Sequence, residues 1–85
     1  MLQDIERKVL RIIHNYLRGR WRLPTIHELT IKTGRNRGKI LEVLEELNRE
    51  RYIIWSPIDP EKMELLEAEE RKPIVNNGWK AYGSN

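Results

Sequence analysis

Apolar residues recur at helical spacing over the first half of the chain and predict two helices that share one core. In residues 3–18 they fall at i, i+4, i+7 and i+8, which places them on one stripe of a helix. In residues 36–50 a second stripe falls at i, i+3, i+4 and i+7. The first stripe consists of Ile5, Val9, Ile12, Ile13 and Tyr16, and the second of Ile40, Val43, Leu44 and Leu47. Because each helix carries an apolar stripe, we expect both stripes to line one three-helix core.

Local signals place a shorter helix between these two, over residues 25–33. Thr25 and Glu28 have the spacing of a capping box, in which each side chain binds the backbone amide of the other residue. Gly34 can adopt the positive φ that ends this helix, and Asn36 can cap the next one. Two helices are therefore expected to meet at a tight corner.

The first helix is expected to end at Gly19, and it carries two further leucines outside its stripe. Leu10 and Leu17 either pack under a sheet or form a dimer contact, and the packing interpretation is favoured. In the connection that follows, Trp21 stands between Arg20 and Arg22. Either these arginines grip a phosphate backbone, or Trp21 folds onto the core while the arginines stay in solvent, and both can hold at once.

The second half of the chain predicts strands and one more helix. Residues 52–56 are rich in β-branched and aromatic residues and predict a strand that stops at Pro57. Asp59 and Pro60 are typical of a helix start and predict an acidic helix over residues 59–72.

Asn77 and Gly78 predict a tight hairpin over residues 74–82, because this pair suits a type I′ turn. Taken by itself, the hairpin is a structural turn that covers the core.

Length and charge bound the class of protein. A chain of 85 residues predicts a single domain over residues 1–85, mainly α with a small antiparallel sheet. Its formal charge of +3 is unevenly spread. Residues 1–51 hold 12 Lys and Arg against 7 Asp and Glu, while residues 52–85 hold 4 against 6. The positive field thus belongs to the half that contains the helical corner, which favours a nucleic-acid partner.

The same inventory offers little for catalysis. The chain has no cysteine, which excludes disulfides and thiolate metal sites, and His14 and His27 fall on different predicted helices. No glycine-rich phosphate loop or nucleophile elbow is present. We therefore expect no enzyme, catalytic residue, cofactor, metal or small-molecule ligand. The charged N-terminus and the lack of a long apolar run predict a cytoplasmic protein with no membrane contact.

Residues 25–54 thus predict a short helix, a glycine turn, a second helix and a strand, in that order. In this order the chain resembles the winged helix-turn-helix DNA-binding domains of bacterial and archaeal regulators over residues 3–56. Residues 23–29 also look like the start of the second helix in the LexA repressor DNA-binding domain. The matching positions are Glu28, Leu29, Gly34, Asn36, Ile40, Leu44, Leu47 and residues 48–53.

The resemblance implies a three-helix core with a β-wing, to which the acidic helix before the last hairpin would be an addition. Under the resemblance, the alternative to a structural turn is that the hairpin over residues 74–82 serves as the DNA-contacting wing, with Lys80 beside its tip. It implies that the helix over residues 36–50 lies in the major groove of double-stranded DNA. A transcriptional regulator that binds DNA as a homodimer is the expected role. The residues expected nearest to DNA are Arg35, Asn36, Arg37, Gly38, Lys39, Leu41 and Glu42, joined by Arg20, Arg22 and Lys80.

Two acidic residues depart from a typical DNA-reading face. Phosphates repel the carboxylates of Glu42 and Glu45, although a carboxylate can accept a hydrogen bond from a cytosine amino group. They favour an alternative, a protein-interaction module on the same fold that uses the acidic helix, Leu10 and Leu17. A replication or plasmid-maintenance factor with the same DNA contacts is the third alternative.

Overall fold

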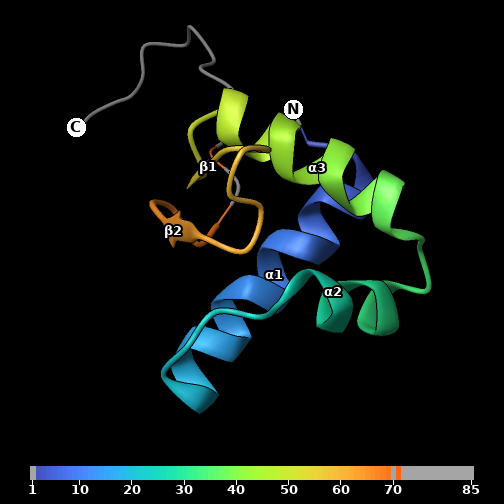
Figure 1. Ribbon diagram of the computed structural model, residues 1–85. Helices are drawn as coiled ribbons and strands as arrows, with labels where there is room; N and C mark the ends of the chain where they lie inside the picture. The colour runs from blue at the N-terminus through green and yellow to red at the C-terminus, as the bar shows by residue number, and fades with distance from the viewer. Residues whose placement is uncertain (1, 70, 72–85) are drawn as a thin grey trace, which may run out of the picture.

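In the part of the chain that the structure describes, three helices and a two-stranded antiparallel sheet make up the fold (Figure 1). The computed structural model describes residues 2–69 and 71. This arrangement confirms the predicted fold class, and each of the three helices lies within two residues of its predicted bounds. The elements are α1 (Asp4–Arg20), α2 (Ile26–Thr33), α3 (Arg37–Arg49), β1 (Ile53–Trp55) and β2 (Met63–Leu65).

The corner between α2 and α3 is fixed by the predicted caps. The Thr25 hydroxyl accepts from the Glu28 amide at 3.1 Å, and the Glu28 carboxylate accepts from the Thr25 amide at 2.8 Å. Gly34 ends α2 with a φ of 72°, a value that favours glycine. The side chain of Asn36 then accepts from the Lys39 amide at 2.8 Å and starts α3.

The end of α1 differs from the expectation. The helix continues through Gly19 to Arg20, and Trp21 takes the left-handed conformation, with a φ of 59°. The Trp21 amide donates to the Leu17 carbonyl at 3.2 Å, which closes the last turn. Gly19 as the helix terminator was therefore wrong. Trp21 is also 89% exposed, so the alternative in which it folds onto the core is wrong.

The core lies where α3 packs against α1, α2 and β1. Leu10 on α1 is buried, which confirms the packing interpretation for this residue, whereas Leu17 remains 39% exposed. The buried apolar residues in this cluster are Leu2, Val9, Leu10, Ile13, Ile26, Leu29, Ile40, Val43, Leu44, Leu47, Tyr52, Ile53 and Trp55.

The predicted acidic helix over residues 59–72 is wrong for its described part, which holds turns and strand β2. Met63 pairs with Trp55 in register, and Ile53 pairs with Leu65. Met63 and Leu65 both pack partly against the core. Alternate residues of a strand face one side of a sheet, so pairing with β1 half-buries both side chains on the core side, whereas a helix would have pointed them to different sides.

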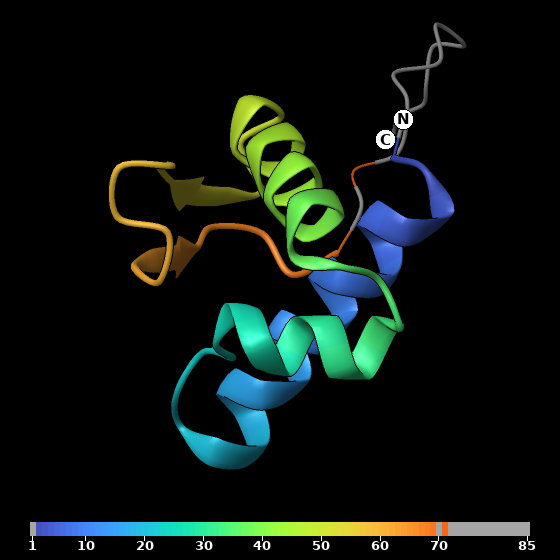
Figure 2. The ribbon, with the colours of Figure 1, turned by 45° about the vertical axis from the view of Figure 1, so that its right-hand side comes forward.

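The loop between β1 and β2 is the part of this hairpin that projects from the three helices (Figure 2). We call residues 53–65 the β1–β2 hairpin. The predicted strand over residues 52–56 shortens to residues 53–55 and stops before Pro57, as expected. The predicted hairpin over residues 74–82, with Lys80, lies outside the described residues.

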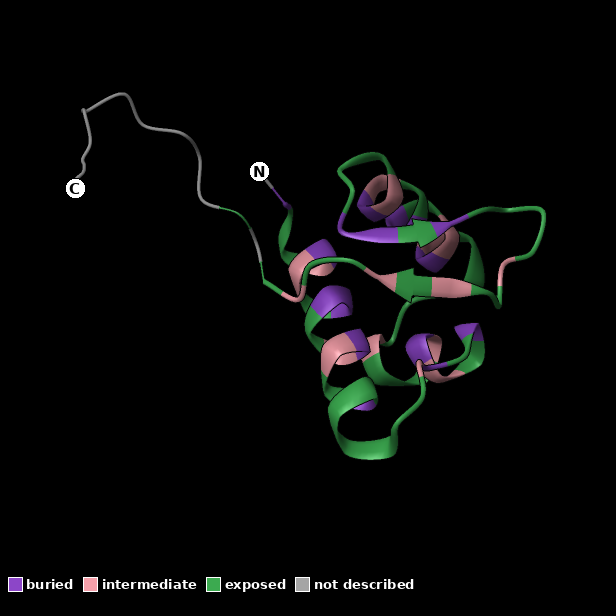
Figure 3. Ribbon diagram, turned by 90° about the vertical axis from the view of Figure 1, so that its left-hand side faces the viewer, coloured by how far each residue is buried: buried purple, intermediate pink, exposed green. Residues whose placement is uncertain are grey.

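After β2 the chain turns back toward α1 (Figure 3). The amides of Leu66 and Glu67 both donate to the Tyr52 carbonyl, at 2.8 and 3.1 Å. The guanidinium of Arg71 lies 4.0 Å from the centre of the Tyr52 ring, so this segment covers the end of β1. None of the helices in residues 2–69 has the length and apolarity needed to cross a membrane.

Candidate nucleic-acid interface

The tight corner brings five predicted site residues together at the start of α3, namely Arg35, Asn36, Arg37, Gly38 and Lys39. Within residues 2–69 and 71, the exposed guanidinium groups of Arg35 and Arg37 have no carboxylate partner. Two unpaired cations therefore flank one helix N-terminus. Such a terminus carries a partial positive charge of its own, so the three charges add.

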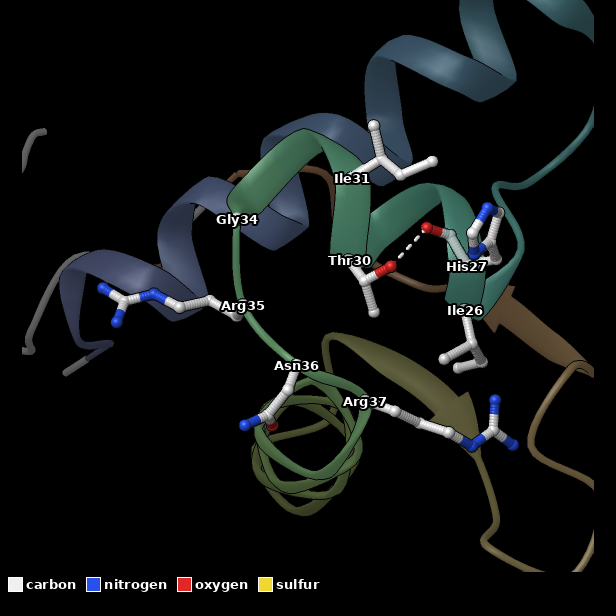
Figure 4. A pocket seen from close by; sticks show the side chains of 8 residues that line it. All are labelled: Ile26, His27, Thr30, Ile31, Gly34, Arg35, Asn36 and Arg37. Carbon is white, nitrogen blue, oxygen red and sulfur yellow. Dashed lines mark hydrogen bonds between the residues drawn. The ribbon is translucent and has the colours of Figure 1, made fainter.

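An open hollow of about 650 Å³ lies between α2 and this helix start. In Figure 4, which looks nearly along α3, Arg35 and Arg37 extend to opposite sides of Asn36. The Thr30 hydroxyl donates to the His27 carbonyl at 2.6 Å, so its proton is already used within α2. The lining residues are Ile26, His27, Thr30, Ile31, Gly34, Arg35, Asn36 and Arg37.

The first turn of α3 presents free backbone donors to solvent. The Asn36 side chain accepts a hydrogen bond from the Lys39 amide, and the Asn36 carbonyl accepts one from the Ile40 amide. Among the described residues, the amides of Arg37 and Gly38 have no such acceptor. Free amides at a helix N-terminus bind anions such as phosphate.

Gly38 leaves the first turn of α3 open to close approach. A Cβ at this position would meet only the Asn36 side-chain oxygen, at an ordinary contact distance of 3.5 Å. Glycine inside a helix costs about 1 kcal/mol relative to alanine. Because no described contact requires glycine here, the open backbone suits a partner that lies against the helix.

The acidic residues of α3 lie farther along the helix. Glu42 pairs with Lys39 at 3.8 Å, and both side chains are well exposed. Such a surface pair contributes at most about 1 kcal/mol, so Lys39 remains able to contact another anion. Glu42 and Glu45 are exposed, as expected, and place negative charge beyond the first turn.

Arg20 and Arg22 lie at the other end of α2, apart from the α3 start. Arg22 binds Glu28 with two hydrogen bonds, of 2.8 and 2.7 Å, so its guanidinium is committed within the fold. Arg20 lies 4.5 Å above the Tyr16 ring, and Lys32 is 6.0 Å from the same ring. Arg20 and Lys32 thus both lie near the Tyr16 ring, at the corner of α1 and α2. Neither has a carboxylate partner among the described residues.

Hydrogen bonding from Arg22, and then from the Thr25 backbone, lowers the pKa of Glu28 from 4.5 to about 2. A carboxylate whose pKa falls on folding stabilises the fold above its unfolded pKa and loses that effect as pH falls through the folded value. We therefore expect acid destabilisation between pH 4.5 and about 2. In thermal unfolding followed by circular dichroism, the melting temperature should fall more steeply with decreasing pH for the wild type than for Glu28→Gln. Parallel pH profiles of the two proteins would contradict this role.

Sequence reasoning missed the contribution of α2 to the hollow. His27 was read only as a residue of the first helical turn, yet it lies on the open side of α2 with Ile31, which is 66% exposed. The signal was available, because the two positions are four apart and share one helix face. Lys32 was missed because its approach to Tyr16 depends on how α2 crosses α1.

Within residues 2–69 and 71, no three side chains of His, Asp or Glu come together as a metal site requires. No protein-family model and no curated protein matches the chain.

Proposed function

We propose that this protein binds double-stranded DNA through α2 and α3, with the start of α3 in the major groove. The observation that carries the proposal is the pair of exposed guanidinium groups, Arg35 and Arg37, at a helix N-terminus beside an open hollow. Neither has a carboxylate partner in the part of the chain that the structure describes. The free amides of Arg37 and Gly38 add phosphate donors to the same spot. An α-helix fits the major groove of B-DNA, and Gly38 lets this one approach closely.

The contacts divide into reading and positioning groups. Arg35, Arg37 and Lys39 supply charge to phosphates or a guanine edge, and Glu42, one turn farther along, is placed to accept from a cytosine amino group. Arg20 adds a phosphate contact on the α1 side. Arg22 orients the start of α2 through Glu28 rather than contacting DNA itself.

A transcriptional regulator in the cytoplasm is the role that the resemblance to winged helix-turn-helix domains favours. A replication or plasmid-maintenance factor would use the same contacts. The protein-interaction alternative keeps only part of its expected surface, because residues 59–69 form no helix and Leu10 is buried, whereas Leu17 is 39% exposed.

The proposal is tested by fluorescence anisotropy of a labelled mixed-sequence duplex, titrated with protein at several salt concentrations. Binding to phosphates releases counterions, so we expect log affinity to fall linearly with log salt, at about −0.9 per phosphate contacted. Three or four contacts would give a slope of roughly −3. A duplex that stays free at low salt, or an affinity indifferent to salt, would overturn the proposal.

A further inference from the structure

The outer face of the β1–β2 hairpin carries exposed apolar side chains. Ile54 is 52% exposed and Leu66, just after β2, is 48% exposed. Ile54 pairs with Glu64 in register, and directly opposed residues share one face of a sheet. The exposed middle positions of the two strands lie side by side in Figure 3. The loop adds Ile58, which is 93% exposed. Nothing in the described residues covers this face.

Opposite charges stand at the two ends of this face. At the root of the hairpin, Ile54 and Leu66 line a hollow of about 440 Å³ together with Arg49 and Arg51. At the tip, Ile54 also lines a hollow of about 290 Å³ that includes both Asp59 and Lys62. With Glu61 between them, the tip carries one net negative charge. Arg49 is paired with Glu46, whereas Arg51 has no carboxylate partner within the described residues. Ile54 therefore lies between a basic root and an acidic tip.

The tip is held in place before any partner arrives. The Ile58 amide donates to the Ser56 hydroxyl at 3.2 Å, and the Trp55 indole donates to the Pro60 carbonyl at 2.9 Å. The Glu61 carboxylate accepts from the Ile26 amide at 3.1 Å, which ties the loop to α2. A loop that is already ordered loses little conformational entropy on binding.

We propose that two copies of this chain pair through their hairpins, outer face to outer face, about a twofold axis close to Ile54. The rotation lays the acidic tip of each copy over the basic root of the other, so that Asp59 meets Arg51 twice. A twofold interface must be self-complementary in this way, and the charge order of the face satisfies that condition. The apolar side chains of Ile54, Ile58 and Leu66 then leave water together.

The surface involved is small, so the dimer is expected to be weak and to form with rising protein concentration. The start of α3 stays uncovered, because Arg49 and Arg51 lie at the opposite end of that helix from Arg35. The pairing does not rest on the proposed DNA binding. If the protein forms a dimer but does not bind DNA, only the DNA-binding proposal fails. If it binds DNA as a monomer, only the pairing proposal fails.

Sedimentation equilibrium over a range of protein concentrations tests the pairing by charge exchange. We expect Arg51→Glu and Asp59→Arg each to weaken the dimer roughly tenfold or more, because like charges then meet twice. Mixing the two variants restores opposite charges at both contacts, so a heterodimer should form. The double variant should form a homodimer again. Circular dichroism checks the fold, and either single variant suffices if the other unfolds.

Restored association that stops at the dimer supports a twofold arrangement. A heterologous contact between positions 51 and 59 would be restored in the mixture too, but it would continue into larger assemblies. A wild type that stays monomeric at the highest soluble concentration would overturn the proposal. Single variants that associate as strongly as the wild type would also overturn it.

Glu64 supplies a second, independent test. It lies beside Ile54 on the paired face, so the two copies would bring two Glu64 carboxylates near the axis. Like charges across an interface oppose association. Glu64→Gln is therefore expected to strengthen the dimer, and a weaker dimer would contradict the position of the axis.

Discussion

The double variant Arg35→Glu, Arg37→Glu is expected to lose roughly 100-fold or more in affinity for duplex DNA, because two phosphate contacts become two repulsions. Its fold should survive. Both positions flank Asn36 at the start of α3, where acidic side chains interact favourably with the helix dipole. Anisotropy measures the affinity, and thermal unfolding measures the stability. The salt dependence of any residual binding should also become shallower by about two units of slope.

The matched control changes the same amount of charge elsewhere. Lys8 and Arg11 are exposed on α1, and neither lines the hollow between α2 and α3. Lys8→Glu with Arg11→Glu should therefore weaken DNA binding far less than the α3 variant. Equal losses would mean that total charge, not the α3 start, governs the affinity.

Leu10→Ala is expected to destabilise the fold by about 2–5 kcal/mol, since it removes a fully packed side chain and leaves a cavity. The free energy of unfolding of a domain of this size is roughly 4–13 kcal/mol, so a large share of the stability would be lost. Urea unfolding followed by circular dichroism gives the free energy of unfolding.

Leu17→Ala is the natural comparison, because it makes the same substitution in the same helix. Leu17 is 39% exposed, so the loss should stay below about 1 kcal/mol. The sequence pattern treats these two leucines alike, whereas the structure separates them. Equal destabilisation by both substitutions would place Leu17 in the core and contradict the packing described.

The α2–α3 corner could be predicted because its signals are local. Thr25 and Glu28 bind each other's amides within one helical turn, and Gly34 and Asn36 act on their own backbone or a neighbouring amide. Each of these contacts spans three or four residues. No knowledge of tertiary packing was needed to place them.

The hairpin could not be predicted in the same way. Asp59 and Pro60 form a good local helix start, but contacts from distant parts of the chain outweigh this preference. Glu61 binds the Ile26 amide across 35 residues, and Met63 pairs with Trp55 while packing on the core. Local propensity is a weak guide where tertiary contacts compete with it.

The sequence predicted the grouping of residues at the centre of the candidate site, but not the side-chain partners at its edges. The cluster at residues 35–39 follows from one turn and one cap. Arg22 instead carries a fold contact, because its bidentate pairing with Glu28 requires the chain to double back after Trp21. A side-chain pairing that depends on the path of a turn cannot be predicted from the periodicity of the sequence.

The most direct test of DNA binding by α2 and α3 is a nitrogen-15 NMR titration of the protein with a short duplex, read at each backbone amide. We expect the largest shifts at residues 35–39, with smaller ones at His27 and Ile31 on the open side of α2. The outer face of the β1–β2 hairpin should shift little. Shifts confined to that hairpin, with residues 35–39 unchanged at saturating duplex, would contradict the assignment of the α3 start as the DNA-binding surface.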